Sequence, residues 1–166
     1  MIPQMAGAQQ RDVVIEHPNR QKASVKVTKA IVVLLLLVSA VLMTIVMIGG
    51  WGTLEGQKPM LVGFIMVYVL LAFYAARWFR GTLPLAAALA ILLLIFAAIA
   101  APEWFARDRT GFLNPSIDES ILGLLTALLI PVQVLLVAFA MRGFSQDWHV
   151  ELERPAGATG PAAAAG

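Results

Sequence analysis

The sequence predicts an all-α membrane protein in which four transmembrane helices form an up-down bundle with both termini in the cytoplasm. Of the 166 residues, 60% are hydrophobic and only 13% are charged, whereas soluble domains are about half apolar and a quarter charged. Four apolar runs are each long enough to cross a hydrocarbon core of roughly 30 Å, which takes about 20 helical residues. The segments between these runs are short, so no separate soluble domain fits.

The N-terminal segment, residues 1–29, is polar and mildly basic, which predicts an unstructured cytoplasmic tail. The alternating residues 24–27 could instead form a strand. The first span is predicted over residues 30–48, because that run is uncharged and two glycines follow it. Val38-Ser39-Ala40 resembles a signal-peptide cleavage site, and cleavage after Ala40 is a competing interpretation. The apolar run continues beyond this site, which favours an uncleaved membrane anchor.

The second and third spans are predicted to form an antiparallel hairpin. The second covers residues 59–76 and begins with a proline, whose missing N–H costs nothing in the first turn of a helix. A basic and aromatic tetrapeptide ends it, and Gly81 and Thr82 form a tight turn. The third span then covers residues 83–101, with Pro84 near its start.

The fourth span is predicted over residues 121–141 and completes a membrane domain of residues 30–144. Ser116 and Glu119 have the spacing of a capping box, which marks the start of a helix. Residues 145–166 are a second cytoplasmic tail, disordered from about residue 155, where only Pro, Gly, Ala and Thr remain. In another interpretation the two tails pair as a ribbon, with Val13-Val14-Ile15 against Val150 and Leu152.

The basic residues set the predicted orientation. With the N-terminus inside, nine of the 12 Lys and Arg residues lie in the cytoplasm and three lie outside, whereas the ten acidic residues divide equally. This asymmetry follows the positive-inside rule. We therefore expect a multi-pass protein of an inner (plasma) membrane, with a prokaryotic origin.

The four tryptophans are predicted to anchor the helices at the membrane–water interfaces. Each follows the end of one predicted span, where an indole ring keeps its body in hydrocarbon and its N–H in water. These residues are Trp51, Trp78, Trp104 and Trp148.

The interiors of the predicted spans contain no Asp, Glu, Lys, Arg or His. Proton-coupled transporters place ionisable groups there, and a buried haem usually needs an axial histidine, so both classes are disfavoured. The absence of cysteine excludes thiolate chemistry. His17 and His149 stand alone in the tails and predict no metal site. A net charge of +2 without a basic stripe predicts no nucleic-acid binding. We expect no catalytic residue and no cofactor.

Helix packing is the role predicted for the polar and small residues inside the spans. Gln133 follows Pro131 by two residues, and we expect it to form a hydrogen bond between helices; a ligand or quinone contact is the alternative. Small residues four apart allow close packing, either within the chain or against a partner. The pairs are Gly123 with Ala127, Ala72 with Ala76, Ala86 with Ala90, and Ala97 with Ala101.

The longest connection, residues 102–120, mixes aromatic and charged side chains. Its candidate docking residues are Glu103, Trp104, Phe105, Arg107 and Phe112. A catalytic role is the alternative, but no nucleophile or paired carboxylate accompanies them.

Three functions are consistent with the sequence. The first is a non-catalytic accessory or structural subunit that packs against other membrane proteins or against itself. The second is a small-molecule or lipid permease, formed as an oligomer and lined by Tyr68, Tyr74 and Gln133. The third is a membrane-embedded enzyme. The absence of charge from the spans favours the first.

Overall fold

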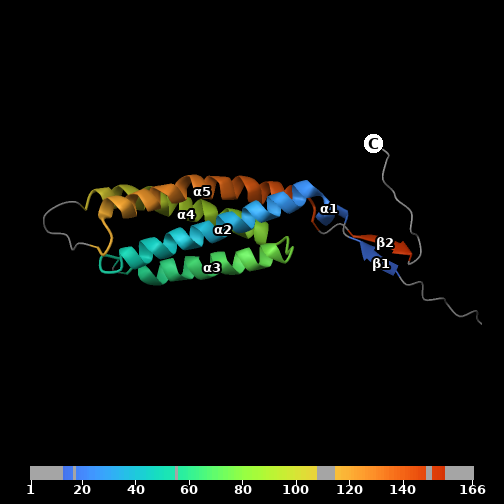
Figure 1. Ribbon diagram of the computed structural model, residues 1–166, viewed down its shortest axis with the longest axis horizontal. Coiled ribbons are helices and arrows are strands. Elements are labelled where there is room, and N and C mark those ends of the chain that lie inside the picture. The colour runs from blue at the N-terminus through green and yellow to red at the C-terminus, as the bar shows by residue number, and fades with distance from the viewer. Residues whose placement is uncertain (1–12, 17, 55, 108–114, 149–150, 156–166) are drawn as a thin grey trace, which may run out of the picture.

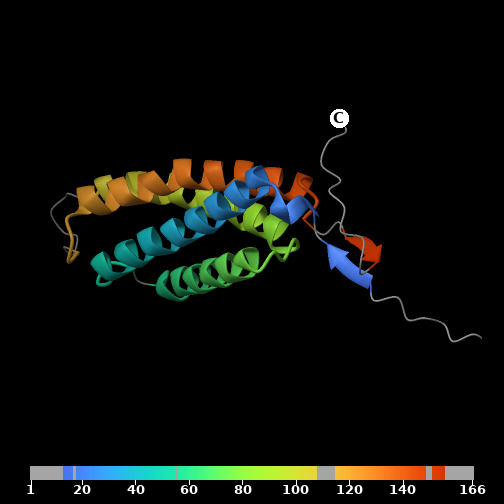
Figure 2. The ribbon, with the colours of Figure 1, turned by 45° about the vertical axis from the view of Figure 1, so that its right-hand side comes forward.

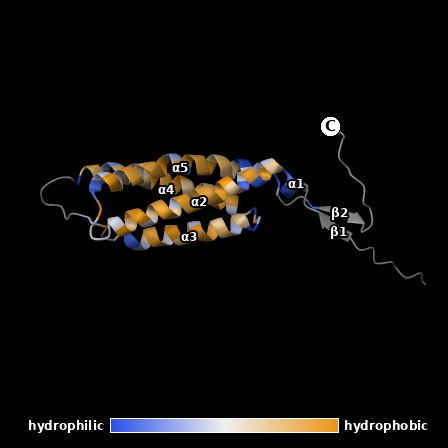
Figure 3. Ribbon diagram, viewed as in Figure 1, coloured by the Kyte–Doolittle hydropathy of each residue, from blue (hydrophilic) through white to orange (hydrophobic). Residues whose placement is uncertain are grey.

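The computed structural model describes residues 13–16, 18–54, 56–107, 115–148 and 151–155. Within these ranges it has four long helices, each long and apolar enough to span a membrane. Figure 3 shows apolar residues along all four and polar residues gathered near their ends. The fold therefore fits a multi-pass membrane protein. The long helices are α2 (Ala23–Gly49), α3 (Lys58–Ala76), α4 (Thr82–Phe105) and α5 (Glu119–Ser145), preceded by the short α1 (Pro18–Gln21).

The four long helices lie alongside one another, and hydrogen bonds identify which chain segments share an end (Figure 1). At one end the backbone N–H of Ser116 donates to the carbonyl of Gly49 at 2.9 Å. At the other, Arg80 donates to the carbonyl of Phe144 at 3.3 Å. We call the first end, which carries the α2–α3 turn and the α4–α5 connection, the turn end. The second carries the α3–α4 turn and both tails, and we call it the tail end.

The helices are not packed equally. The most extensive contact joins α4 to α5, and α2 packs against both α3 and α5, whereas α3 and α4 touch little. The turned view in Figure 2 shows α3 at one side of the bundle, apart from α5. Because α3 rests mainly on α2, it is also the least buried span. In its most apolar stretch 22% of the residues are buried, compared with 33–39% in the other three.

Helix α2 begins seven residues before the predicted start of the first span, so the prediction of an unstructured tail to residue 29 is wrong for this segment. Lys26 and Lys29 come directly before the apolar run and set its predicted start. Lysine is a good helix former, however, so the helix extends through both. At about 1.5 Å per residue, 27 residues measure about 40 Å, more than the roughly 30 Å that the bilayer core requires. The proposed strand at residues 24–27 is therefore helical.

Helices α4 and α5 also exceed their predicted bounds. Helix α4 continues through Pro102 to Phe105, although the proline cannot donate the backbone hydrogen bond to the carbonyl four residues earlier. Helix α5 starts at Glu119 and is capped by Asp118, whose side chain accepts a hydrogen bond from the N–H of Ser120 at 2.9 Å. The predicted capping box at Ser116 is thus replaced by an aspartate cap, which stabilises a helix start equally well.

The two tails form a small ribbon beyond the tail end (Figure 1). Strand β1 (Val13–Glu16) pairs antiparallel with β2 (Leu152–Pro155), with Val14 opposite Arg154 and Glu16 opposite Leu152. A tail-to-tail ribbon was the alternative that the sequence offered to unstructured tails, but the register differs: Val13, Val14 and Ile15 lie opposite residues 153–155, and Val150 lies outside the described residues. The disorder predicted beyond residue 155 concerns residues 156–166, which lie outside the described ranges.

Candidate functional site

A chain of hydrogen bonds between side chains joins three helices in the interior of the bundle. The Tyr68 hydroxyl of α3 donates to Oε1 of Gln133 in α5 at 2.9 Å. Nε2 of Gln133 then donates to Oγ of Ser39 in α2 at 2.8 Å, and Ser39 donates to the carbonyl of Leu35 at 2.7 Å. We call Ser39, Tyr68 and Gln133 the polar relay.

The polar relay is closed to its surroundings, because all three side chains have an exposed fraction of 0%. Gln133 was predicted to bond to a neighbouring helix, and it bonds to two. Interhelical hydrogen bonds in membranes contribute about 0.6 kcal/mol each on average. The larger effect is that each polar side-chain atom of the relay has at least one hydrogen-bond partner, because a buried polar atom without any in hydrocarbon would cost more than either bond contributes.

Tyr74, the third residue of the predicted permease path, lies elsewhere. Its side chain is 47% exposed, and its ring contacts Phe73 and Phe79 at centroid distances of 5.6 and 5.9 Å. Tyr68 and Gln133 therefore converge and Tyr74 does not. In this single chain the three do not line a common path.

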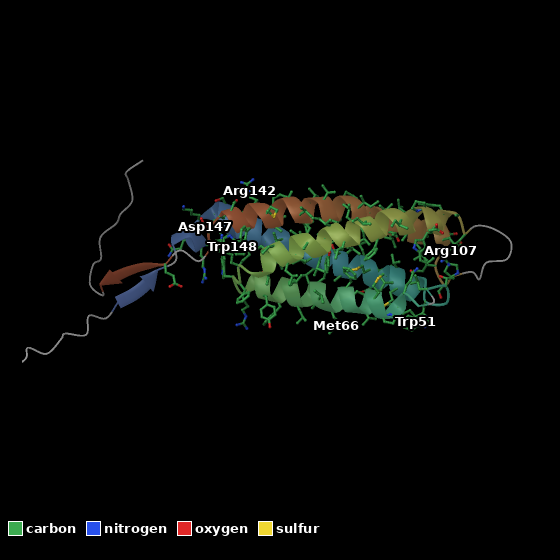
Figure 4. All side chains as sticks on the ribbon, turned by 180° about the vertical axis from the view of Figure 1, so that it is seen from behind. Trp51, Met66, Arg107, Arg142, Asp147 and Trp148 are labelled. Atoms are coloured by element: carbon green, nitrogen blue, oxygen red, sulfur yellow. The ribbon has the colours of Figure 1, made fainter. Side chains whose placement is uncertain are left out.

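The second cluster lies at the tail end, where Trp148 is completely buried. Its ring meets that of Trp78 edge to face at a centroid distance of 5.4 Å. Gly143 makes room for it, because a Cβ there would lie 3.1 Å from Cζ2 of Trp148. Arg20 donates from Nε to the Trp148 carbonyl at 2.9 Å, which ties α1 to the segment after α5. Figure 4 shows Trp148 at this end of the bundle beside Asp147.

Basic side chains lie close to this pair of rings, two of them over Trp78. The Nζ of Lys29 lies 3.9 Å from the Trp78 ring centroid and also donates to the carbonyl of Ala76 at 3.2 Å. Arg80 forms a salt bridge with Asp147 at 3.0 Å. Trp78 has a φ of 66°, a left-handed conformation that is rare for a bulky residue. Such strain persists only where neighbouring groups hold it, and the contacts of Trp78 with Trp148 and Lys29 do so here.

The tryptophans of the turn end differ from each other. Trp51 is 52% exposed, and Nζ of Lys58 lies 4.6 Å from its ring centroid, which suits an interfacial anchor. Trp104 is only 4% exposed. A Cβ on Gly50 would lie 2.6 Å from Cη2 of Trp104, so its ring fills the space that this glycine leaves. Trp104 and Trp148 therefore pack against the rest of the chain. Each ring lies against a glycine: Gly50, directly after α2, for Trp104, and Gly143, near the end of α5, for Trp148.

The small residues serve mainly the packing of the chain itself. Gly123 is buried, and a Cβ there would lie 2.8 Å from Cζ of Phe105. Ala127 is half-buried, Ala72 is buried and Ala76 is exposed. The alanines of α4 that form the other two pairs are also buried: Ala86, Ala90, Ala97 and Ala101.

The predicted docking loop is partly helix. Glu103, Trp104 and Phe105 form the last turn of α4, and Arg107 follows directly. The Arg107 guanidinium lies 4.9 Å from the Trp104 ring centroid. Phe112 lies outside the described residues. Figure 4 places Arg107 and Trp51 at the turn end, opposite Trp148.

A cleft opens between α3 and α4 at the turn end, where these two helices diverge. Its interior is almost entirely apolar and encloses about 70 Å³. Residues of all four long helices line it, including Phe64 of α3 and Phe96 of α4. Its mouth holds about 360 Å³ and is lined by Gln57, Glu103 and Arg107. Six residues line both the interior and the mouth, so the two spaces are adjacent, and we call them together the α3–α4 cleft: Leu54, Gln57, Met60, Phe96, Ala100 and Trp104.

In the described part of the chain, no group of three His, Asp or Glu side chains is placed to bind a metal ion. His17 and His149 lie outside that part.

No protein-family model matches the chain, and no curated protein or solved structure matches it significantly.

Proposed function

We propose that this chain is a non-catalytic accessory or structural subunit that packs against other proteins in the inner membrane of a prokaryote. The observation that supports it most is the closed polar relay, in which Ser39, Tyr68 and Gln133 bond to one another. Pumps and channels need polar groups that face a path. Here the polar groups are used to hold helices together, which is what a packing scaffold requires.

The proposed topology is an up-down bundle with the tail end in the cytoplasm. The basic residues near the membrane gather at the tail end, including Arg77 and Arg80 in the α3–α4 turn, whereas Lys58 and Arg107 belong to the turn end. Short loops with excess Lys and Arg stay in the cytoplasm.

Single cysteines test this orientation, because the natural chain contains none. Gly52→Cys at the turn end and Gly81→Cys at the tail end are both exposed, and neither Cβ would meet an atom closer than 3.4 Å. A membrane-impermeant maleimide added to intact cells is expected to label Gly52→Cys and to reach Gly81→Cys only after permeabilisation. The reverse pattern would place the termini outside.

The partner surface in this proposal is the outer face of α3, the least buried span. Met66 on this face is 59% exposed and points away from the bundle in Figure 4. Leu124 of α5 is 66% exposed and provides a matched control position. The alanine pairs are a weaker choice, because most of them are already buried within the chain.

A photoreactive residue at Met66 is expected to crosslink one membrane protein, in stoichiometric amount, in cells. The same residue at Leu124 should crosslink lipid alone, because a partner on α3 leaves that face to the bilayer. The tagged chain should also retain the same protein in mild detergent. A monomer that crosslinks no protein from either position would refute the accessory role.

The permease and enzyme hypotheses receive less support from the geometry. Tyr68 and Gln133 are bonded to each other and Tyr74 lies outside, so the proposed lining is incomplete within one chain. Glu103 and Arg107 provide charge at the cleft mouth, but no nucleophile lines it. The lipid-binding part of the second hypothesis has a separate basis in the α3–α4 cleft.

A further inference from the structure

The α3–α4 cleft has a small interior and a larger mouth. Its space falls from about 360 Å³ at the mouth to about 70 Å³ inside. A helix with its side chains is about 10–12 Å across, so a partner helix does not fit the interior. A single hydrocarbon chain is thinner and more flexible, so its end can enter the apolar interior beside Phe64 and Phe96, whose rings contact each other edge to face at 6.0 Å.

The mouth of the cleft lies at the level of the lipid headgroups. Helix α4 has 24 residues, about 36 Å at 1.5 Å per residue. A hydrocarbon core of roughly 30 Å therefore leaves its last turn at the membrane boundary. Glu103 lies in that turn, and Arg107 follows it.

Two opposite charges stand side by side at this mouth. Glu103 and Arg107 are four residues apart and both line the same space. Among the described residues they form no ion pair with each other. The Arg107 guanidinium is instead held against the Trp104 ring, at 4.9 Å from its centroid. A cation in this place suits a phosphate, and the carboxylate beside it suits an ammonium group.

We propose that the α3–α4 cleft binds one zwitterionic phospholipid of the bilayer, with the end of an acyl chain in its apolar interior. Arg107 binds its phosphate and Glu103 its ammonium group, as in a phosphatidylethanolamine. The lipid fills the space where α3 and α4 diverge and so completes the packing of α3. This inference stands independently of the accessory role, since a lipid in this cleft leaves the outer face of α3 free.

Lipid retention tests the proposal with a cleft-filling variant and its matched control. Ala100 lines both parts of the cleft, whereas Ala98 is exposed on the same helix and lines neither. The protein is reconstituted in nanodiscs of equal phosphatidylethanolamine and phosphatidylglycerol, released into mild detergent and weighed by native mass spectrometry. Wild type and Ala98→Leu should each retain one phosphatidylethanolamine. Ala100→Leu should reduce this retention about tenfold, a loss of about 1.4 kcal/mol in binding.

The charge pair is tested by Arg107→Gln, which leaves the apolar interior of the cleft unchanged and keeps the test decisive if Ala100→Leu unfolds. Its retention of phosphatidylethanolamine should also fall about tenfold. Phosphatidylethanolamine with a photoreactive acyl chain should label peptides that contain Phe64 or Phe96 in preference to those with Leu124. Four results would each overturn the proposal: no retained lipid, equal retention of phosphatidylglycerol, equal losses in Ala98→Leu and Ala100→Leu, or a protein crosslinked in the cleft.

Discussion

Replacing Trp148 by alanine is expected to lower the free energy of unfolding by about 3–5 kcal/mol, the usual cost of truncating a buried tryptophan. Trp148 has no exposed surface and contacts Trp78 and Gly143. Its indole lies beyond the end of α5, where lipid tails do not fill the vacated space. Because native stabilities are only about 5–15 kcal/mol, this loss is a large part of the total.

Thermal unfolding in detergent, followed by near-ultraviolet circular dichroism, measures this effect. Trp51→Ala is the control, because it removes the same side chain from a position that is 52% exposed. Its expected effect is within about 0.5 kcal/mol, the usual range for surface substitutions. Equal destabilisation by the two variants would contradict the internal role of Trp148. The hydrogen bond from Arg20 survives in Trp148→Ala, since it is made to the backbone carbonyl.

Gln133→Leu is expected to destabilise the bundle by about 1–3 kcal/mol. The substitution keeps the side chain close to its original size but removes both interhelical hydrogen bonds of the polar relay. The Ser39 hydroxyl keeps its bond to the Leu35 carbonyl, whereas the Tyr68 hydroxyl loses its acceptor. An unsatisfied hydroxyl in hydrocarbon accounts for most of the expected cost. Unfolding by a denaturing detergent at fixed lipid content provides the measurement.

Two further variants locate the origin of that cost. Tyr68→Phe added to Gln133→Leu removes the unsatisfied hydroxyl. The double variant should therefore lose less free energy of unfolding than the sum of the losses in the two single variants. Tyr74→Phe removes a hydroxyl from a side chain that is 47% exposed and should change stability little. Strictly additive effects of the two relay substitutions would show that Tyr68 and Gln133 do not act as a pair.

Hydropathy was sufficient for the four spans, because each apolar run is uncharged and as long as the bilayer requires. It placed their ends less well. Lys29 and Glu103 interrupt the apolar pattern although the helix continues through both. The bilayer sets the length of the apolar part of a helix. It does not set how far the helix continues into water, where polar helix formers can extend it.

The burial of Trp104 and Trp148 could not be read from sequence position alone. A tryptophan after a helix end lies near the boundary in either case, and only the surrounding backbone decides whether its ring faces lipid or protein. Gly50 and Gly143 are the relevant signal, because each leaves room for one of these rings. The sequence also did not identify the hydrogen-bond partner of Gln133, because Ser39 was one of several polar residues in the spans.

The polar relay also bears on how the chain is assembled during synthesis. Gln133 provides both interhelical bonds, and the one to Ser39 joins positions that are 94 residues apart. Membrane chains are made from the N-terminus, so α2 and α3 enter the bilayer before α5 exists. Until the last span arrives, α2 and α3 are held together without the relay. A ribosome stalled before α5 would therefore leave an incomplete bundle in which the Tyr68 hydroxyl lacks its acceptor in the membrane.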